Sequence, residues 1–219
     1  MTPAVAGMRG PEIPGFQWVR PLGQGGFADV FLYRQELPSR EVAIKVVRTQ
    51  GDERGTKELH READAMTLLA GHPAVVELHG VGTTADGRAY LVMEYCPVAD
   101  LLTQVRARPM SLAKALDMMI KVCGGVEMFH RQGYVHRDIK PSNIMLDAYG
   151  KPVLADFGVA SKVGQLEVGA FDGFSVLWAP PEQQDVNSPA SPLQDVWALA
   201  ATTWTFVTGR SPFEDPIGD

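Results

Sequence analysis

Apolar and polar residues alternate through much of the first hundred positions, a pattern typical of strands with one buried face. Residues 16–35 alternate on both sides of a glycine-rich turn and predict a hairpin. Residues 41–47 predict a further strand, in which Lys45 interrupts an apolar run. Residues 72–96 predict two more strands, with Thr-Ala-Asp-Gly at 84–87 as the turn between them. This part of the chain is therefore expected to be rich in β-structure.

Three segments carry apolar residues at helical spacing instead. Residues 55–70 predict an amphipathic helix, and Ser111 is a suitable N-cap for a longer helix that runs to about Gln132. Residues 193–209 are apolar on nearly all faces and end at a glycine, which predicts a helix buried in a core. The expected stripes are Leu59, Ala63, Met66 and Ala70 in the first helix, and Leu112, Leu116, Met119, Cys123, Val126 and Phe129 in the second.

Composition narrows the class of protein. A net charge of −6 argues against a nucleic-acid surface and against a polybasic membrane patch. The N-terminus has no apolar core of a signal peptide, and the longest apolar run, Val196–Val207, is too short to cross a bilayer. Cys96 and Cys123 lack metal-ligand spacing and are expected to be reduced thiols in or near a core. We therefore expect a cytoplasmic segment without membrane contact, preceded by a flexible tail over residues 1–15.

The chemistry is concentrated in residues 134–158. This segment predicts a loop, a hairpin with strands at 144–146 and 153–155, and a second loop. Such a hairpin places Asn143 and Asp156 at the same end of two paired strands, where their oxygens suit Mg²⁺. Asp138, five residues before Asn143, is then near enough to take a proton from a hydroxyl that attacks a nucleotide.

The order of these residues resembles the eukaryotic-type (Hanks-type) serine/threonine protein kinases. His136-Arg137-Asp138 and Asn143 match the catalytic loop H-R-D-x-x-x-x-N, and Asp156-Phe157-Gly158 match the metal loop D-F-G. The resemblance extends from Phe16 to the last residue. The sequence of residues 175–183, Ser-Val-Leu-Trp-Ala-Pro-Pro-Glu-Gln, resembles that of bacterial members of the family. It implies an α+β, two-lobed protein kinase-like fold.

The implied domains are a β-rich N-lobe with its hinge over 16–97 and a mainly helical C-lobe over 98–219. The C-lobe is expected to be truncated after the central helix and to lack its last helices, which would leave helix 193–209 partly uncovered. The same truncation would remove the arginine partner of Glu182.

The resemblance also implies the site residues. Asp138 is the catalytic base and Lys140 stabilises the transferring phosphoryl group, while Asn143 and Asp156 hold Mg²⁺, or Mn²⁺ in its place. Lys45, paired with Glu62 rather than Glu58, holds the α- and β-phosphates of ATP. Met93 lies at the back of the adenine pocket and limits access to it, residues 94–96 form the hinge, and Asp100 lies near the ribose. The other nucleotide-binding positions are Leu22, Gly23, Gly25, Gly26, Val30, Ala43, Glu94, Cys96 and Met145.

Two positions and one segment depart from the family pattern. Ala28 replaces the third glycine of the phosphate loop, a change expected to weaken rather than abolish the cover over the phosphates, and Pro180 replaces the alanine of A-P-E. No threonine or tyrosine occurs between Gly158 and Glu182, where Ser161 and Ser175 are the only hydroxyls. Either this loop is ordered without phosphate, through Glu167 or Asp172, or the phosphorylation switch is absent.

The resemblance implies transfer of the γ-phosphate of ATP to serine and threonine hydroxyls of proteins. Lys140 is typical of the serine/threonine branch, in which the residue at Ser175 bonds the Asp138–Lys140 pair. Asp195 is expected to accept hydrogen bonds from the backbone around His136 and Arg137. Two alternatives stay open: a catalytically impaired, truncated kinase-like scaffold, and a small-molecule phosphotransferase, against which the Trp-Ala-Pro-Pro-Glu-Gln segment argues.

Overall fold

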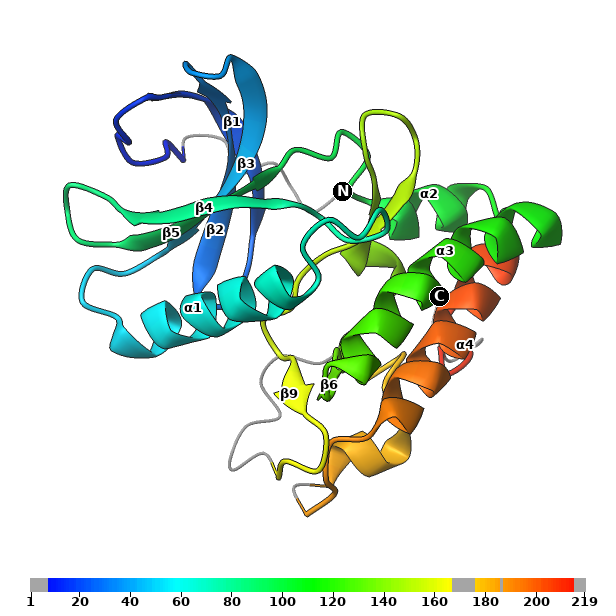
Figure 1. Ribbon diagram of the computed structural model, residues 1–219. Coiled ribbons are helices and arrows are strands. Elements are labelled where there is room, and N and C mark those ends of the chain that lie inside the picture. The colour runs from blue at the N-terminus through cyan, green and yellow to red at the C-terminus, as the bar shows by residue number, and fades with distance from the viewer. Residues whose placement is uncertain (1–7, 167–175, 186, 215–219) are drawn as a thin grey trace. The chain divides into compact units, whose positions relative to one another are not determined.

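The computed structural model describes residues 8–166, 176–185 and 187–214, and its chain divides into two compact units (Figure 1). Unit 1 comprises Met1–Ala70 and Val76–Cys96, and unit 2 comprises Gly71–Val75 and Pro97–Asp219. The division differs from the predicted lobes at two points, the first of which is that Pro97 belongs to unit 2. The second is that the short segment Gly71–Val75 packs with unit 2, because the N–H of Leu154 donates to Ala74 and Val75 forms a bridge with Leu154.

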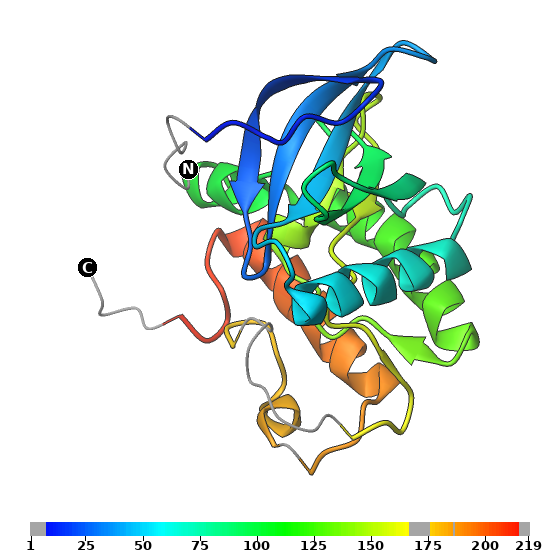
Figure 2. The same ribbon diagram turned by 90° about the vertical axis from the view of Figure 1, so that its left-hand side faces the viewer.

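Unit 1 is a five-stranded antiparallel sheet with one helix, as the alternating pattern predicts. The strand order is β1-β2-β3-β5-β4. The helix packs against one side of the sheet, as Figure 2 shows from a second direction. The elements are β1 (Phe16–Gln24), β2 (Ala28–Gln35), β3 (Arg40–Val47), α1 (Glu53–Leu68), β4 (Leu78–Thr83) and β5 (Ala89–Glu94).

The sheet buries apolar residues on both faces. On one face Leu59 and Ala63 of α1 pack against residues of β3 and β5. The other face holds Ile13, which is 4% exposed, in a cluster with residues of β2, β3 and β5. Tyr33 also donates a hydrogen bond from its hydroxyl to the carbonyl of Pro11 (2.7 Å). Residues 8–15 therefore differ from the predicted flexible tail, because the apolar Ile13 gains burial against the sheet.

Unit 2 is mainly helical, with short strands that frame its loops. Ser111 caps α3 as predicted, and Gly209, with φ 78°, ends α4 in the left-handed conformation. The helices are α2 (Leu101–Ala107), α3 (Leu112–Arg131) and α4 (Pro192–Thr208), with 3₁₀ turns η1 (Pro141–Asn143) and η2 (Pro181–Gln184). The strands are β6 (Tyr134–Val135), β7 (Ile144–Leu146), β8 (Pro152–Leu154) and β9 (Ser161–Lys162).

The buried face of α3 is rotated from the predicted stripe. Leu112 and Leu116 are 58% and 44% exposed, and Cys123 is exposed rather than near a core. The face that packs keeps Met119, Val126 and Phe129 of the predicted stripe and adds Met118 and Val122 together with the small residues Ala115 and Gly125. Its buried members are Ala115, Met118, Met119, Val122, Gly125, Val126 and Phe129. Cys96, by contrast, is buried as expected.

The helix α4 lies beside α3 (Figure 1) and buries one side only. Its buried side includes Asp195 and Thr202, whereas its apolar residues Val196 and Trp204 are each 55% exposed. Trp197 stacks on Phe213 with ring centroids 5.7 Å apart. Among the described residues, no helix has the length and apolar character needed to span a membrane.

Candidate active site

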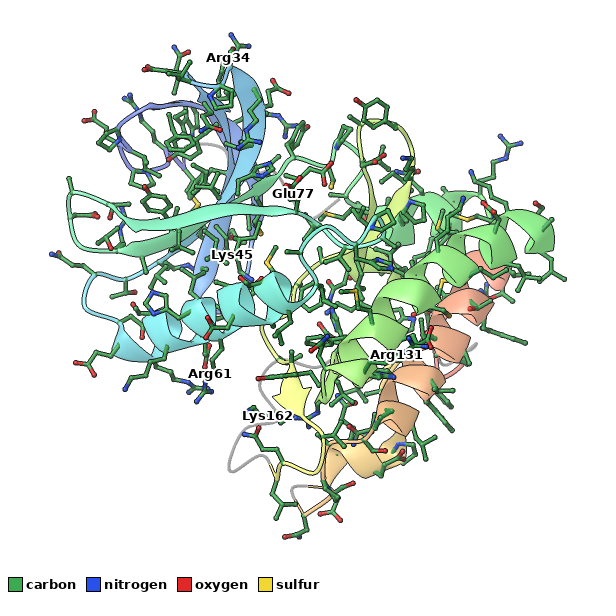
Figure 3. The ribbon with its side chains drawn as sticks, viewed as in Figure 1. Arg34, Lys45, Arg61, Glu77, Arg131 and Lys162 are labelled. Carbon is green, nitrogen blue, oxygen red and sulfur yellow. The ribbon has the colours of Figure 1, made fainter. Side chains whose placement is uncertain are left out.

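In unit 1, a buried ion pair joins β3 to α1. The ammonium of Lys45 lies 2.7 Å from Oε2 of Glu62, which is 1% exposed. Glu58, the alternative partner weighed from the sequence, binds Arg54 instead at 2.9 Å. The strand alternation turns Lys45 toward α1 (Figure 3), so the pair follows from regular secondary structure. Each buried charge is thereby neutralised, as burial requires.

The turn between β1 and β2 is open to an approaching ligand at two of its three glycines. The N–H of Gly25 donates to the carbonyl of Ala28 (2.8 Å), and a Cβ on Gly25 would lie 3.1 Å from that oxygen. A side chain at position 25 would therefore crowd this carbonyl, which favours glycine there. At Gly23 and Gly26 a Cβ would meet nothing within 4 Å, so these glycines leave space beside the backbone. That space fits a phosphate group that approaches main-chain N–H groups.

The remaining unit 1 candidates lie on β1, β2, β3 and β5 or, for Cys96, just beyond β5. Val30 is opposite Lys45 in the register of β2 and β3, and Ala43 is opposite Met93 in that of β3 and β5. Residues that are directly opposite share a face of the sheet, so Val30, Ala43 and Met93 lie on the face of Lys45. Three further positions of the predicted set lie in unit 1: Leu22 is half-buried on β1, Glu94 ends β5, and Cys96 is buried just beyond it.

Asp100 belongs to unit 2, where it caps a helix. Its side chain accepts a hydrogen bond from the N–H of Thr103 at 3.0 Å, at the start of α2. Partial burial raises the pKa of Asp100, but the hydrogen bonds from Thr103 outweigh it and the pKa lies below the usual value. Capping is thus its observed role, and contact with a ribose stays a prediction. Met145 lies half-buried on β7.

The predicted catalytic loop of unit 2 gathers its polar groups around Asp138. Oδ2 of Asp138 accepts from Lys140 Nζ at 2.8 Å and from Asn143 Nδ2 at 2.9 Å. Asp138 is 5% exposed, and its burial raises the pKa of its carboxyl above the usual range. The nearby charge of Asp156 acts in the same direction, whereas Lys140 lowers the pKa. A buried carboxylate with a raised pKa is better suited to accept a proton than an exposed one.

The donors at the end of the β7–β8 hairpin fit a hard cation. Asn143 Nδ2 donates to both Asp138 O (2.8 Å) and Asp138 Oδ2, so its amide oxygen is the atom suited to coordination. The N–H of Ala155 donates to the carbonyl of Asn143 (2.9 Å), which fixes Asp156 next to the end of the same strand pair. The described residues contain no group of three or more His, Cys, Asp or Glu suited to a metal. One carboxylate and one amide match Mg²⁺ that is bound mainly through substrate phosphates.

Asp195 of α4 holds the backbone of this loop, as the sequence predicts. It is fully buried and accepts from the N–H groups of His136 and Arg137, both at 2.8 Å. Its Oδ2 also lies 2.7 Å from Nε2 of His130 on α3. Arg137 has φ 68° and Asp156 has φ 63°, values that are rare for residues other than glycine. Strained backbone of this kind persists where the surroundings fix it and is enriched at functional sites.

Three supporting residues were not found from the sequence. Gln183 of η2 donates to the carbonyl of Arg137 (2.7 Å), and Thr202 of α4 donates to the carbonyl of Ile139 (3.3 Å). His130 is the third, through Asp195. Thr202 lies seven residues after Asp195, on the same face of an otherwise apolar helix, and that spacing could have revealed it. Gln183 carries no such signal, because its contact depends on tertiary structure alone.

Arg137 has a hydroxyl partner in the segment that follows the metal loop. Its Nη1 donates to Oγ of Ser161 at 3.0 Å, and Ser161 is 3% exposed on β9. The strands β6 and β9 pair Val135 with Ser161, which brings the two segments together. The other predicted residues of this segment, Glu167, Asp172 and Ser175, lie outside the described residues.

Comparison with known proteins gives one family and several relatives. The family described as Protein kinase domain matches residues 16–219. Serine/threonine-protein kinase PknK of Mycobacterium tuberculosis is 38% identical over 218 residues, which is 95% of this chain and 20% of that protein. Serine/threonine-protein kinase PrkC of Bacillus subtilis is 33% identical, over 94% of this chain and 32% of that protein. The chain thus spans about a fifth to a third of the length of these relatives.

Proposed function

The chain belongs to the protein kinase domain family, and from this membership we propose that it transfers the γ-phosphoryl group of ATP to serine and threonine hydroxyls of proteins. The names of its relatives PknK and PrkC, both serine/threonine-protein kinases, support this acceptor class. The observation that carries the proposal is the Asp138 cluster: a buried carboxylate, held by a lysine and an asparagine, on a loop that Asp195 fixes.

In the proposed reaction Asp138 orients the acceptor hydroxyl and accepts its proton. Lys140, 2.8 Å from Asp138, supplies a positive charge beside the transferring phosphoryl group. The hydrogen bond from Asn143 fixes the orientation of the Asp138 carboxylate, so less reorganisation is needed when the hydroxyl arrives. The raised pKa of Asp138 brings its basicity nearer to the working pH.

The family uses ATP and a divalent metal, and the proposed metal is Mg²⁺, with Mn²⁺ as a substitute. Asn143 and Asp156 would hold it, and Lys45, kept in place by Glu62, would hold the α- and β-phosphates. When bound, the metal neutralises negative charge on the phosphates. Asp156→Asn should therefore shift the Mg²⁺ dependence of nucleotide binding to higher concentration, and an unchanged Mg²⁺ titration would refute the metal assignment.

The proposed activity is tested by incubating the chain with ATP labelled in the γ-phosphate and a protein acceptor that contains serine, threonine and tyrosine. Phosphoamino-acid analysis should find the label on serine and threonine. The matched control is Asp138→Asn, which should lower the labelling of the acceptor by roughly 10²-fold or more. Label on tyrosine alone would contradict the acceptor class. Tight ATP binding without transfer by the unsubstituted chain would instead indicate an impaired, kinase-like scaffold.

A further inference from the structure

One arginine binds every carbonyl at the tip of the glycine-rich turn. Arg48 follows β3 directly, and its Nη2 and Nη1 donate to the carbonyls of Gly25 (2.6 Å) and Gly26 (3.3 Å). Its main-chain N–H donates to the carbonyl of Phe27 at 2.9 Å. Residues 25–27 are the whole connection between β1 and β2, so all three of its carbonyls are oriented by the same residue.

The guanidinium of Arg48 is itself held by a buried carboxylate. Its Nη2 lies 2.9 Å from Oδ1 of Asp29, and its Nε lies 3.3 Å from both carboxylate oxygens. Asp29 is 3% exposed and its backbone is paired with Val46 on β3 and with Gln24 on β1. The arginine is therefore tied to the regular part of the sheet at one end and to the turn at the other.

We infer that Arg48 is a positioning residue that pre-organises the glycine-rich turn for the phosphates of the nucleotide. Carbonyl oxygens carry partial negative charge and repel phosphate oxygens, whereas main-chain N–H groups attract them. The guanidinium of Arg48 draws the carbonyls of Gly25 and Gly26 toward a cation, and its main-chain N–H holds the carbonyl of Phe27, so that these oxygens do not turn toward a phosphate. This inference rests on the proposed function, since it assumes that the ligand of the turn is a nucleotide.

The contacts that Arg48 makes with the turn and with Asp29 require the guanidinium of arginine and cannot be made by the ammonium of lysine. The planar guanidinium has five N–H donors and can contact the two carbonyls and the carboxylate together. An ammonium on the flexible stem of lysine is a compact charge and cannot reproduce this fork. Arg48→Lys therefore keeps the charge beside Asp29 but releases part of the turn.

The test compares ligands with and without phosphates. Dissociation constants for Mg²⁺·ATP, Mg²⁺·ADP and adenosine are measured by titration calorimetry for the unsubstituted chain and for Arg48→Lys. If the released turn adopts the phosphate-binding conformation for only a fraction of the time, the apparent dissociation constants of Mg²⁺·ATP and Mg²⁺·ADP rise roughly 3- to 10-fold. Adenosine, which lacks phosphates, should change by less than about twofold, since pre-organisation of the turn does not affect it.

Two further variants separate positioning from a general loss of structure. Arg34→Lys is the matched control, because Arg34 is exposed on β2 and lies toward the end of the sheet away from Lys45 (Figure 3). Its affinities should match those of the unsubstituted chain. The double variant Arg48→Gln with Asp29→Asn removes both charges together, so that no buried carboxylate is left unpaired. It should lose affinity for ATP and ADP at least as strongly as Arg48→Lys does, with adenosine unchanged.

The outcomes distinguish the inference from the function on which it rests. If the unsubstituted chain binds ATP and both Arg48 variants bind it equally well, the inference is overturned and the proposed function is unaffected. If ATP and adenosine affinities fall together, Arg48 supports the fold in general and the inference is also overturned. If the unsubstituted chain binds no ATP, the proposed function fails and the inference fails with it.

Discussion

The buried ion pair Lys45–Glu62 of unit 1 stands on regular secondary structure, whereas the buried Asp138 of unit 2 stands on a loop. Lys45 and Glu62 are brought together by a strand and a helix, and their 2.7 Å contact follows from the alternation of one and the periodicity of the other. Asp138 lies on irregular backbone, close to a residue with φ 68°. The comparison shows that one cluster is positioned by its elements and the other by dedicated hydrogen bonds.

The loop needs this support because its conformation is unfavourable by itself. Residues in sparsely populated backbone conformations cost of the order of 1–3 kcal/mol each. Arg137 is held through its N–H by Asp195 and through its carbonyl by Gln183, and Ile139 is held through its carbonyl by Thr202. The cluster of unit 2 therefore depends on more residues, and on more distant ones, than the ion pair of unit 1.

The largest expected effect is on turnover and comes from a substitution of Asp138 in the loop itself. Asp138→Asn removes the proposed base while it keeps the size of the side chain, so turnover should fall roughly 10²- to 10⁴-fold. The measurement is the initial rate of phosphoryl transfer at saturating ATP and acceptor. A variant that kept more than about a tenth of the turnover would show that Asp138 is not the base.

A smaller effect, on the free energy of unfolding, is expected when Asp195, which supports the loop, is substituted. Asp195→Asn leaves only one of the two buried acceptor oxygens facing the N–H groups of His136 and Arg137, so the free energy of unfolding should fall by roughly 1–3 kcal/mol. Chemical denaturation measures it. The control is Asp117→Asn, a change to the exposed i, i+4 pair with Lys121 on α3, which should be almost neutral. Equal destabilisation by both changes would contradict the bracing role of Asp195.

The smallest expected change is a shift in the pH dependence of turnover when Lys140 is substituted. Asp138 must be ionised to act as a base, so turnover should fall as the pH drops through its pKa, which burial holds above the usual value. Lys140 lowers that pKa, and Lys140→Gln should therefore move the acid limb of the pH–rate profile to higher pH. An acid limb that stays in place, or moves to lower pH, would contradict this coupling.

The ionisation of Asp138 with rising pH should raise turnover but lower the stability of the fold. The folded-state pKa of Asp138 lies above its unfolded value, so its contribution to stability is fully present below the unfolded pKa and is lost as the pH rises through the folded pKa. Asp138→Asn should consequently lose turnover at neutral pH without a comparable loss in melting temperature. Parallel measurement of both quantities across pH distinguishes a catalytic role from a structural one.

The same contrast explains how far the sequence could predict the structure. Regular elements were predictable because periodicity and capping are local: the caps Ser111 and Gly209 lie where expected, and the β7–β8 hairpin is present with its second strand one residue earlier than predicted. The stripe predicted for α3 was confirmed at Met119, Val126 and Phe129 but was wrong at Leu112, Leu116 and Cys123, which are exposed. The small residues Ala115 and Gly125, which an apolar stripe of large residues leaves out, are buried on this helix. The packing of Ile13 and the hydrogen bond of Gln183 depend on tertiary contacts, which no local pattern of the sequence encodes.

We propose that the two clusters divide the work: Lys45 holds the nucleotide and Asp138 acts on the acceptor. The most direct test is the dissociation constant of Mg²⁺·ATP for the unsubstituted chain, Lys45→Met and Asp138→Asn. Lys45→Met should raise the constant about tenfold or more, because a charge-assisted contact with the phosphates is lost. Asp138→Asn should leave it within about twofold, since Asp138 does not hold the nucleotide. A comparable loss of ATP affinity in both variants would contradict the division.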